Sequence, residues 1–250
     1  TQGYLTLSTL KGFEMINNKD DYLHTLIESY RIFASDRDNI TFDYGGNDQN
    51  FLGTNDEYIM DKVNLFDKQA AGKYNFPQPH GGGTAYMNAV DQNGLGISLI
   101  QSNFYGIGSR IGVGNYGFFL HNRGCGFNLI KGHPNSLGPN KKPLHTLSPT
   151  IWSKDGSLDF ITGTRGGRYQ PQLLAQTILP YILGETSFEE IMKKPRWTIE
   201  YFGANTSSNI KFEFIKEPKI SSLEDKGHKI SIENKLIGGY GPISTIYKNS

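Results

Sequence analysis

Two apolar runs joined by a turn signal place the strongest constraint on how this chain folds. Residues 84–91 alternate as a strand does, and residues 95–100 form a second apolar run directly after Asn93-Gly94. Asn-Gly between two such runs is the strongest short-range signal for a β-hairpin. The sequence therefore predicts an antiparallel hairpin that starts at Thr84.

The length of the hairpin loop decides which residue lies opposite Thr84. A three-residue loop, Gln92-Asn93-Gly94, sets Ser102 there, whereas a two-residue loop shifts the register and sets Asn103 there. Directly opposed side chains share a sheet face, about 4.5–5.5 Å apart at Cβ. Either register therefore brings a second polar group beside the Thr84 hydroxyl.

Glycines at positions 81–83 precede Thr84. Glycine at Gly83 leaves its carbonyl open to a nucleophile, because no Cβ flanks it. If Thr84 became a chain terminus, its own α-amine, with an ordinary pKa of about 7.7–8.0, would activate its hydroxyl. On pattern alone, a purely structural role is commoner than a catalytic one, because threonine is a good strand residue and glycines before a strand often mark a tight loop.

A second glycine loop, Gly163 to Gly167, follows an expected strand at 158–162 and precedes an expected helix at 171–183. This order of elements presents unobstructed backbone N–H groups to an anion. No Walker or dinucleotide-binding pattern is present. Once Thr84 is accepted as a nucleophile, backbone donors at the Gly166-Gly167 pair are better interpreted as an oxyanion hole.

Capping residues and apolar periodicity predict the remaining elements. Asp20 or Asp21 caps a helix with a buried face at Leu23, Leu26, Ile27, Tyr30 and Phe33, and Ser187 with Glu190 forms a capping box. Further helices are expected at 58–66 and 221–227, and further strands at 117–120, 150–152, 199–202, 210–214, 229–232 and 242–247.

Composition excludes several classes of function. The net charge of +1 over 250 residues argues against nucleic-acid or polybasic membrane binding. No apolar run approaches the ~20 residues of a membrane span. The single cysteine, Cys125, excludes an internal disulfide and favours the cytoplasm, with a periplasmic or secreted location left open. Most lone cysteines are small buried hydrophobes.

The sequence shows no metal-ligand spacing, and no cofactor or metal is predicted. The lone histidines His24, His133 and His228 are interpreted as surface or packing residues.

The order and spacing of several sequence blocks are far more specific to one family than any single block is. Besides residues 84–91, the Asn-Gly turn and residues 98–103, they are Leu120-His121-Asn122-Arg123-Gly124, Gly132-His133-Pro134-Asn135, Pro143-Leu144-His145-Thr146-Leu147, Gly163-Thr164-Arg165-Gly166-Gly167-Arg168-Tyr169-Gln170-Pro171-Gln172 and Pro195-Arg196-Trp197. Over essentially the whole chain, this series resembles the γ-glutamyltransferases. More specifically, it resembles the γ-glutamyltransferase-like branch of the N-terminal-nucleophile hydrolases.

The resemblance implies an α+β fold, a four-layer αββα sandwich. Residues 1–83 would be the C-terminal part of a large subunit, and residues 84–250 the small subunit, intertwined in one domain. The larger part of that large subunit would lie outside this chain. A homo-oligomer of the heterodimer is an open expectation.

The resemblance also implies an autoprocessing zymogen. It would cleave itself between Gly83 and Thr84, form an acyl-enzyme at Thr84, and transfer a γ-glutamyl or related acyl group from glutathione-like amides to water or an amine. The implied catalytic residues are Thr84, Ser102, Gly166 and Gly167. The implied substrate-binding residues are Asn103, Asn122, Arg123, His145 and Thr146.

The sequence departs from the family pattern where substrate is recognised. Gly126 stands at the position of the acidic residue that grips the substrate α-amine, and His145-Thr146 replaces paired serines. Arg123 would attract carboxylates, or would form a structural salt bridge. A dicarboxylate-type acyl group, a catalytically silent homologue and a non-enzymatic ligand-binding module rich in β-structure therefore remain alternatives.

Overall fold

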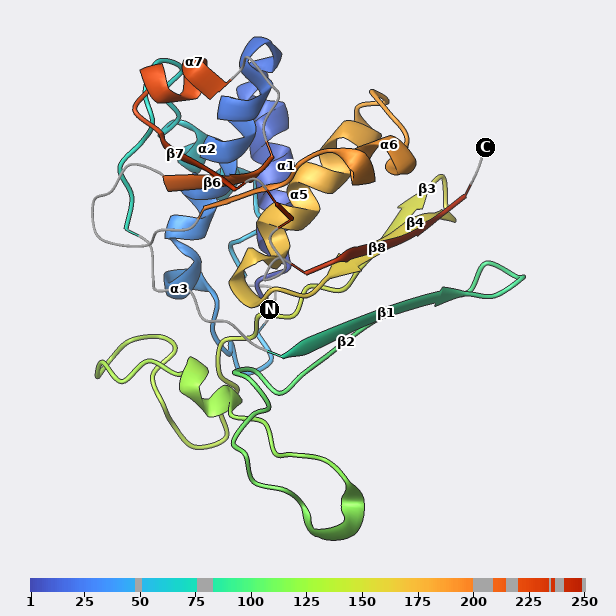
Figure 1. Ribbon diagram of the computed structural model, residues 1–250. Coiled ribbons are helices and arrows are strands. Elements are labelled where there is room, and N and C mark those ends of the chain that lie inside the picture. The colour runs from blue at the N-terminus through green and yellow to red at the C-terminus, as the bar shows by residue number, and fades with distance from the viewer. Residues whose placement is uncertain are drawn as a thin grey trace.

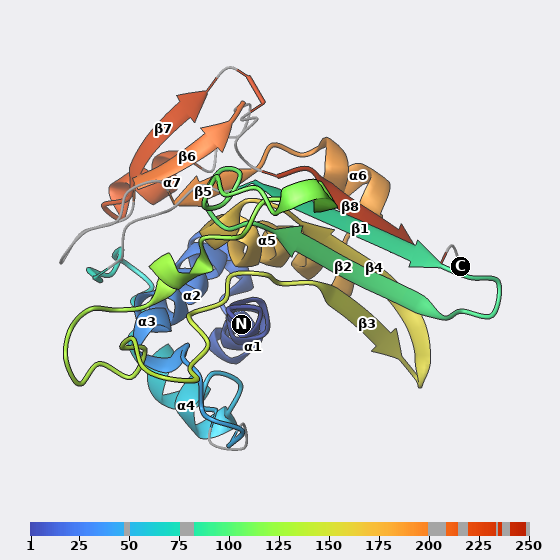
Figure 2. The same cartoon turned by 90° about the horizontal axis from the view of Figure 1, so that it is seen from below.

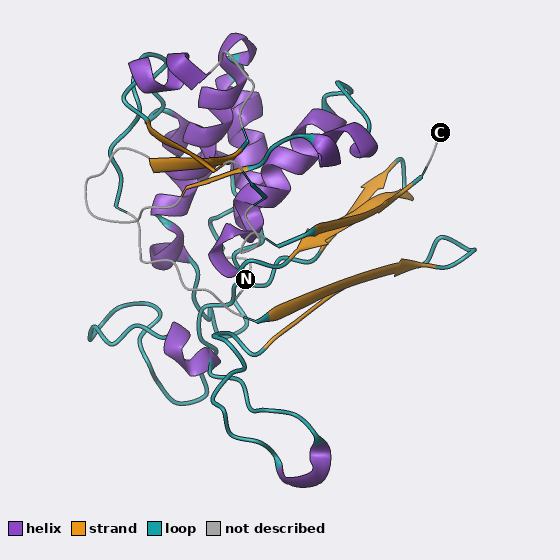
Figure 3. Ribbon diagram, in the orientation of Figure 1, coloured by secondary structure: helices purple, strands orange, loops and turns teal. Residues whose placement is uncertain are grey.

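The computed structural model describes residues 1–47, 51–75, 83–199, 209–214, 220–233, 235–236 and 241–248. Helices and strands both contribute to its core (Figure 1, Figure 3). The helices are α1 (Tyr4–Ile16), α2 (Tyr22–Ser35), α3 (Arg37–Ile40), α4 (Asp56–Val63), α5 (Gln170–Ile182), α6 (Phe188–Lys193) and α7 (Ile220–Asp225). The strands are β1 (Thr84–Val90), β2 (Gly96–Ser102), β3 (Thr150–Lys154), β4 (Ser157–Thr164), β5 (Trp197–Ile199), β6 (Asn209–Glu213), β7 (Lys229–Glu233) and β8 (Ile243–Tyr247).

An antiparallel sheet of order β3-β4-β8 forms the middle layer. Helices α5 and α6 lie on one face of this sheet, and the β1-β2 hairpin lies on the other (Figure 1, Figure 2). Phe160 of β4 packs toward the helices in a buried cluster with Leu174, Ile178, Phe188 and Ile191. The result is a helix, sheet and hairpin stack, in which burial of this cluster holds α5 against β4.

Small residues let the hairpin approach the middle sheet closely. A Cβ on Gly163 would come within 2.3 Å of the ring of Tyr86, so only glycine leaves room for that ring. Tyr86 is two residues from Thr84, and Gly163 lies near the end of β4, just before the loop that contains Gly167. This contact therefore brings the start of β1 to the glycine loop that follows β4.

The hairpin has the register predicted for a three-residue loop. Thr84 pairs with Ser102, and the pairs continue to Val90 with Gly96. Asp91 closes the turn, because its Oδ1 accepts from the N–H groups of Asn93 and Leu95 at 2.8 and 2.9 Å. The alternative register, with Asn103 opposite Thr84, is wrong.

The N-terminal helices share their core with the second half of the chain. Asp21 caps α2 by accepting from the His24 N–H, and the predicted apolar face of α2 is buried, apart from the partly buried Leu23. A single cluster combines Phe13 and Ile27 from before Thr84 with Leu179 and Trp197 from after it. With 14 residues, α2 is the longest described helix, and none of the described helices could span a membrane.

The expected strand at residues 117–120 is wrong. This segment makes backbone hydrogen bonds to residues 109–113, but the pairing amounts to an isolated bridge between Gly112 and Phe119, and Gly117 has a left-handed φ of +74°. The side chains of Phe118, Phe119 and Leu120 are exposed, so little burial of apolar surface stabilises a longer strand there. The other predicted elements are found with shifts of up to three residues at their ends, except that Tyr201 and Phe202 lie outside the described residues.

The four-layer sandwich is found in part. The described residues place helices on one face of the two stacked sheets only. The opposite face of the hairpin is apolar and exposed, with Met87, Ile97 and Leu99 each 46–53 % exposed. A fourth, helical layer over this face stays a prediction.

Candidate active site

The Thr84 hydroxyl lies at the start of β1 beside two other polar groups. Thr84 Oγ1 donates to Ser102 Oγ at 3.0 Å, and Ser102 Oγ donates to the Gly83 carbonyl at 3.2 Å. The Phe104 N–H also donates to Ser102 Oγ, at 3.1 Å. A hydroxyl has one proton and two lone pairs, so the Ser102 hydroxyl is fully used. It connects the predicted nucleophile to the carbonyl of the predicted scissile bond.

Backbone geometry on both sides holds this arrangement in place. The Gly83 N–H donates to the Gly106 carbonyl at 3.2 Å, and a Cβ on Gly83 would lie 2.5 Å from that oxygen. Phe104 has a φ of +78°, a conformation that costs a non-glycine residue on the order of 1–3 kcal/mol. The hydrogen bond from its N–H to Ser102 offsets part of this cost.

The glycine pair after β4 has backbone angles that favour glycine. Gly166 and Gly167 have φ values of +123° and +55°. The fully buried Gln2 donates through Nε2 to the carbonyls of Gly167 and Thr146, at 2.8 Å each. Gln2 was not selected from the sequence, because one glutamine near a helix start carries no signal. It fixes the glycine loop against the segment that contains Thr146.

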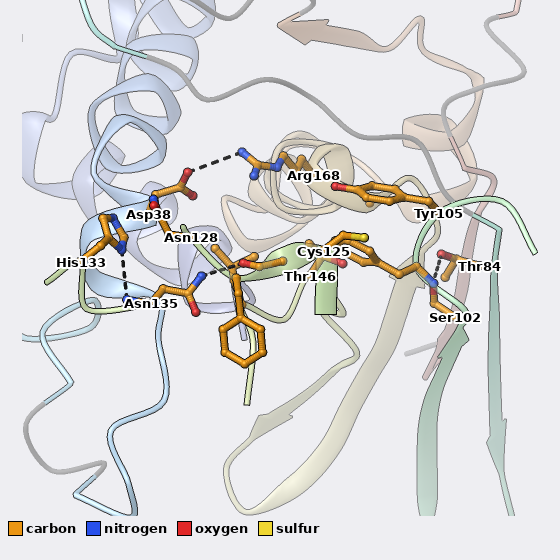
Figure 4. A pocket seen from close by; sticks show the side chains of 15 residues that line it. Asp38, Thr84, Ser102, Tyr105, Cys125, Asn128, His133, Asn135, Thr146 and Arg168 are labelled. Carbon is orange, nitrogen blue, oxygen red and sulfur yellow. Dashed lines mark hydrogen bonds and ion pairs between the residues drawn. The ribbon is translucent and has the colours of Figure 1, made fainter. Parts of the chain in front are cut away.

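Thr84, Ser102 and Gly167 line one cavity of about 240 Å³. Figure 4 shows Thr84 and Ser102 at one end of the lining, and Asp38 and His133 well away from them. Gly166 is not among the lining residues. The remaining ones are Phe104, Tyr105, Cys125, Gly126, Phe127, Asn128, Asn135, Leu144, Thr146 and Arg168.

Arg123 does not line this cavity. Its guanidinium lies 4.9 Å from the centre of the Phe104 ring and donates to Thr146 Oγ1 and the Ser102 carbonyl, at 3.4 Å each. It makes no salt bridge among the described residues. Burial lowers the pKa of Arg123 below its ordinary value. These contacts favour a structural role for Arg123, in place of either the carboxylate site or the salt bridge expected from the sequence.

Asn122 and Asn103 also lie outside the lining. Asn122 accepts from the Tyr105 N–H at 2.9 Å and donates to the carbonyls of Tyr105 and Gly108. Asn103 Nδ2 donates to the Ile107 carbonyl at 3.4 Å. Both asparagines therefore shape the loop that carries Tyr105 into the cavity.

His145 is half-buried and Thr146 is buried. Burial, followed by the nearby charge of Arg123, lowers the pKa of His145 to about 4, so this imidazole is neutral at pH 7. Among the predicted substrate-binding residues, Thr146 is the one that lines the cavity.

A charged pair that the sequence analysis did not select lies in the cavity lining. Arg168 Nη1 is 3.9 Å from Asp38 Oδ2, beyond hydrogen-bond distance, and has no hydrogen-bond partner among the described residues. Asn135 Oδ1 is likewise buried without a partner, while its Nδ2 donates to the Gly126 carbonyl at 2.7 Å. Spacing alone could not reveal this group, because its members come from distant segments.

Cys125 is exposed and lines the cavity, so the expectation of a buried cysteine is wrong. His133 also lines the cavity, whereas His24 and His228 are packing residues in a different region.

His24 Nδ1 and His228 Nε2 lie 2.8 Å apart, and with Glu28 they form a group whose ligand atoms lie within 4.8 Å of one another, close enough to hold a metal ion. However, the Glu28 carboxylate is already ion-paired with the buried Arg31. A guanidinium therefore supplies the positive charge that balances this carboxylate.

A threonine at the start of a strand, stacked sheets and a glycine loop that lines the same cavity are features expected of the N-terminal-nucleophile type of hydrolase fold. The family described as Gamma-glutamyltranspeptidase matches residues 2–249, and the chain belongs to this family. The prediction drawn from the sequence blocks is therefore confirmed.

Individual relatives are similar over different parts of the chain. The "Glutathione hydrolase-like YwrD proenzyme" of Bacillus subtilis is 29% identical over 96% of this chain and 46% of its own length. The "Oxamate amidohydrolase proenzyme" of Klebsiella pneumoniae is 33% identical over 62% of this chain and 30% of its own length. The chain thus spans less than half the length of these relatives.

Solved structures confirm the type of fold. A cephalosporin acylase from Bacillus halodurans superposes with a TM-score of 0.82 at 24% identity, over 99% of this chain and 45% of that one. A mutant γ-glutamyltranspeptidase from Helicobacter pylori gives a TM-score of 0.53 at 21% identity, over 65% of this chain and 89% of that one.

Proposed function

We propose that this protein is an autoprocessing amidohydrolase or transpeptidase in which Thr84 forms an acyl-enzyme. The observation that carries the proposal is the hydrogen-bonded series from Thr84 Oγ1 through Ser102 Oγ to the Gly83 carbonyl, at the edge of a cavity that Gly167 also lines. It supports roles for Thr84 as nucleophile, for Ser102 as proton relay and for the backbone at Gly167 as a donor.

Autoprocessing would begin with attack of Thr84 Oγ1 on the Gly83 carbonyl carbon. Ser102 Oγ accepts the hydroxyl proton as its own proton moves to the carbonyl oxygen, which becomes a hydroxyl in the tetrahedral intermediate. The proton of this new hydroxyl is then transferred to the peptide nitrogen as the C–N bond breaks, leaving an ester and a free α-amine on Thr84. Water then hydrolyses the ester, giving a carboxylate on Gly83 and restoring the Thr84 hydroxyl.

Mature Thr84 would then act on an external amide. Its α-amine, with an ordinary pKa of about 7.7–8.0, accepts the hydroxyl proton as Oγ1 attacks the substrate carbonyl. The same proton is delivered to the leaving amine when the amide bond breaks. Water or an acceptor amine next attacks the ester and releases the acyl group. Backbone donors at Gly166 and Gly167 would stabilise the oxyanion in both steps.

The acyl donor would be a γ-glutamyl or related amide, in keeping with relatives described as glutathione hydrolases and an oxamate amidohydrolase. Both parts of the chain would stay together after cleavage, since residues on either side of Thr84 form one apolar cluster. Residues 1–83 would then belong to a large subunit and residues 84–250 to a small one.

The test uses protein expressed from its complete reading frame. Mass spectrometry should find a polypeptide that begins at Thr84, and Thr84→Ala should abolish both this cleavage and hydrolysis of acyl anilides. The control is Thr150→Ala, a strand threonine outside the cavity lining. An intact, active Thr84→Ala protein would refute the mechanism. Cleavage without activity toward any amide would indicate a silent homologue, and an uncleaved wild type would indicate a binding module.

A further inference from the structure

The guanidinium of Arg168 is held in the cavity without a full complement of partners. Its Nη1 is buried and makes no hydrogen bond among the described residues. The facing carboxylate oxygen, Asp38 Oδ2, is 3.9 Å away, and the Arg168 side chain is 14% exposed. A buried donor left unpaired is costly, so an acceptor from a ligand would stabilise this end of the cavity.

The charges at this end sum to a positive value. Asp38 Oδ1 already accepts from Nε and Nη2 of Arg37. Two guanidinium groups, Arg37 and Arg168, therefore share one carboxylate. Asp38 is also the one carboxylate among the lining residues, and His133 can add only a neutral or a positive group. An anion neutralises the excess charge, whereas a cation does not.

An α-ammonium group would find no carboxylate free to hold it. Gly126 also lines the cavity and contributes only backbone there. Asn135 Oδ1 offers a hydrogen-bond acceptor but no charge. A ligand ammonium would thus lose its hydration without gaining an ion pair.

From these observations we infer that Arg168 binds a carboxylate on the acyl group. The acyl donors are then monoamides of dicarboxylic acids, such as glutaryl or succinyl amides, rather than γ-glutamyl amides. The guanidinium presents its N–H groups in a planar fork that matches a carboxylate. Arg123 is not assigned this role, because it lies outside the lining and its Nη1 and Nη2 already donate to Thr146 Oγ1 and the Ser102 carbonyl. This inference rests on the proposed function of Thr84.

The first test compares anilides that differ only in their acyl group, on the mature full-length protein. Glutaryl anilide carries the carboxylate alone, γ-glutamyl anilide adds the ammonium, and pentanoyl anilide has neither. We expect kcat/KM to be highest for glutaryl anilide, at least about tenfold above each of the others. Malonyl, succinyl and adipyl anilides then define the best chain length.

The second test changes the charge at Arg168. Arg168→Gln should lower kcat/KM for glutaryl anilide by about 10- to 100-fold, the loss expected for one hydrogen bond to a charged group. It should leave pentanoyl anilide within about threefold. Arg168→Lys, which keeps the charge but not the fork, should retain part of the preference. The matched control is Arg165→Gln, in the same loop but exposed and outside the lining.

Cys125 supplies a readout that does not depend on turnover, because it is exposed in the same cavity. Glutarate should slow alkylation of Cys125 by N-ethylmaleimide in the wild type and in Arg165→Gln, and should fail to do so in Arg168→Gln. Peptide mass spectrometry quantifies the modified residue.

Different experimental outcomes would overturn the role of Thr84 and the carboxylate site at Arg168. Absence of cleavage at Gly83-Thr84, or of any acyl-enzyme, would overturn the proposed function. A cleaved and active protein that prefers γ-glutamyl or pentanoyl anilide would overturn the carboxylate site alone. So would equal losses for glutaryl and pentanoyl anilide in Arg168→Gln, or protection by glutarate that survives this substitution.

Discussion

Replacing Ser102 by alanine removes one hydroxyl and leaves three polar groups without their partner. Thr84 Oγ1 loses its acceptor, the Gly83 carbonyl loses a donor at 3.2 Å, and the Phe104 N–H loses an acceptor at 3.1 Å. The loss at Gly83 affects the rate of autoprocessing and the loss at Phe104 affects stability, so the two effects can be measured separately.

The loss at Gly83 affects the rate of autoprocessing. The oxygen of this carbonyl gains negative charge when Thr84 attacks, and removing one donor from such an oxygen slows a reaction by about 10²–10³-fold, or about 2.7–4 kcal/mol. The loss at Phe104 affects stability. An unpaired buried N–H costs about 1–3 kcal/mol, and here it belongs to a residue with a φ of +78°.

The assay is a time course of precursor made from the complete reading frame, with mass spectrometry of the chain that begins at Thr84. Ser102→Thr keeps the hydroxyl and should process at a rate within about tenfold of wild type. Ser98→Ala is the matched control, because Ser98 lies on the same strand and contacts Tyr86 instead. If Ser102→Ala cleaved within threefold of Ser98→Ala, the relay from Thr84 to Gly83 would be refuted.

Further predictions concern backbone fit, loop support and pH. Gly83→Ala should slow processing by at least about tenfold in the same time course, because its Cβ would lie 2.5 Å from the Gly106 carbonyl oxygen; wild-type rates would contradict this. Asn122→Ala should lower the free energy of unfolding by about 1–3 kcal/mol in urea titrations, since three hydrogen bonds of the loop depend on it; an unchanged value would refute a supporting role. Burial, then the charge of Arg31, lowers the pKa of His228 to about 3, so between pH 6.5 and about 3 the unfolded chain binds more protons than the native one. Stability should therefore fall on acidification from pH 6.5, by up to about 1.4 kcal/mol per pH unit, and His228→Gln should flatten this dependence; stability that rose from pH 7 to 5 would contradict the sign.

Local signals in the sequence were sufficient for the scaffold of the site. Asn93-Gly94 fixes a turn because glycine takes the positive φ that the loop requires, +83° here. Alternation along residues 84–91 then sets the faces of the strand, and the register follows from loop length. The caps of α2 and α6 were predictable for the same reason: each depends on one side chain and an N–H group three residues later.

Features set by tertiary contacts were not predictable in this way. Residues 117–120 have the composition of a strand, yet their backbone hydrogen bonds to residues 109–113 form no more than an isolated bridge, and their side chains stay exposed. Gln2 reaches Gly167 across 165 positions of the chain. His24 and His228 meet across 204 positions. No spacing rule covers such distances.

The two arginines show why the chemistry of the cavity needed coordinates. By sequence, Arg123 lies in a block that resembles the family's substrate-binding segment, and Arg168 is one more residue after a glycine pair. In the structure, the Arg123 guanidinium lies over the Phe104 ring and donates to the Ser102 carbonyl, outside the cavity lining. Arg168 instead faces the cavity with a buried donor unpaired. Substrate selectivity depends on which charged side chain lacks a partner of opposite charge. Whether a side chain has such a partner is decided by packing rather than by residue type. An arginine that is structurally engaged and an arginine that is available to a ligand have the same letter in the sequence.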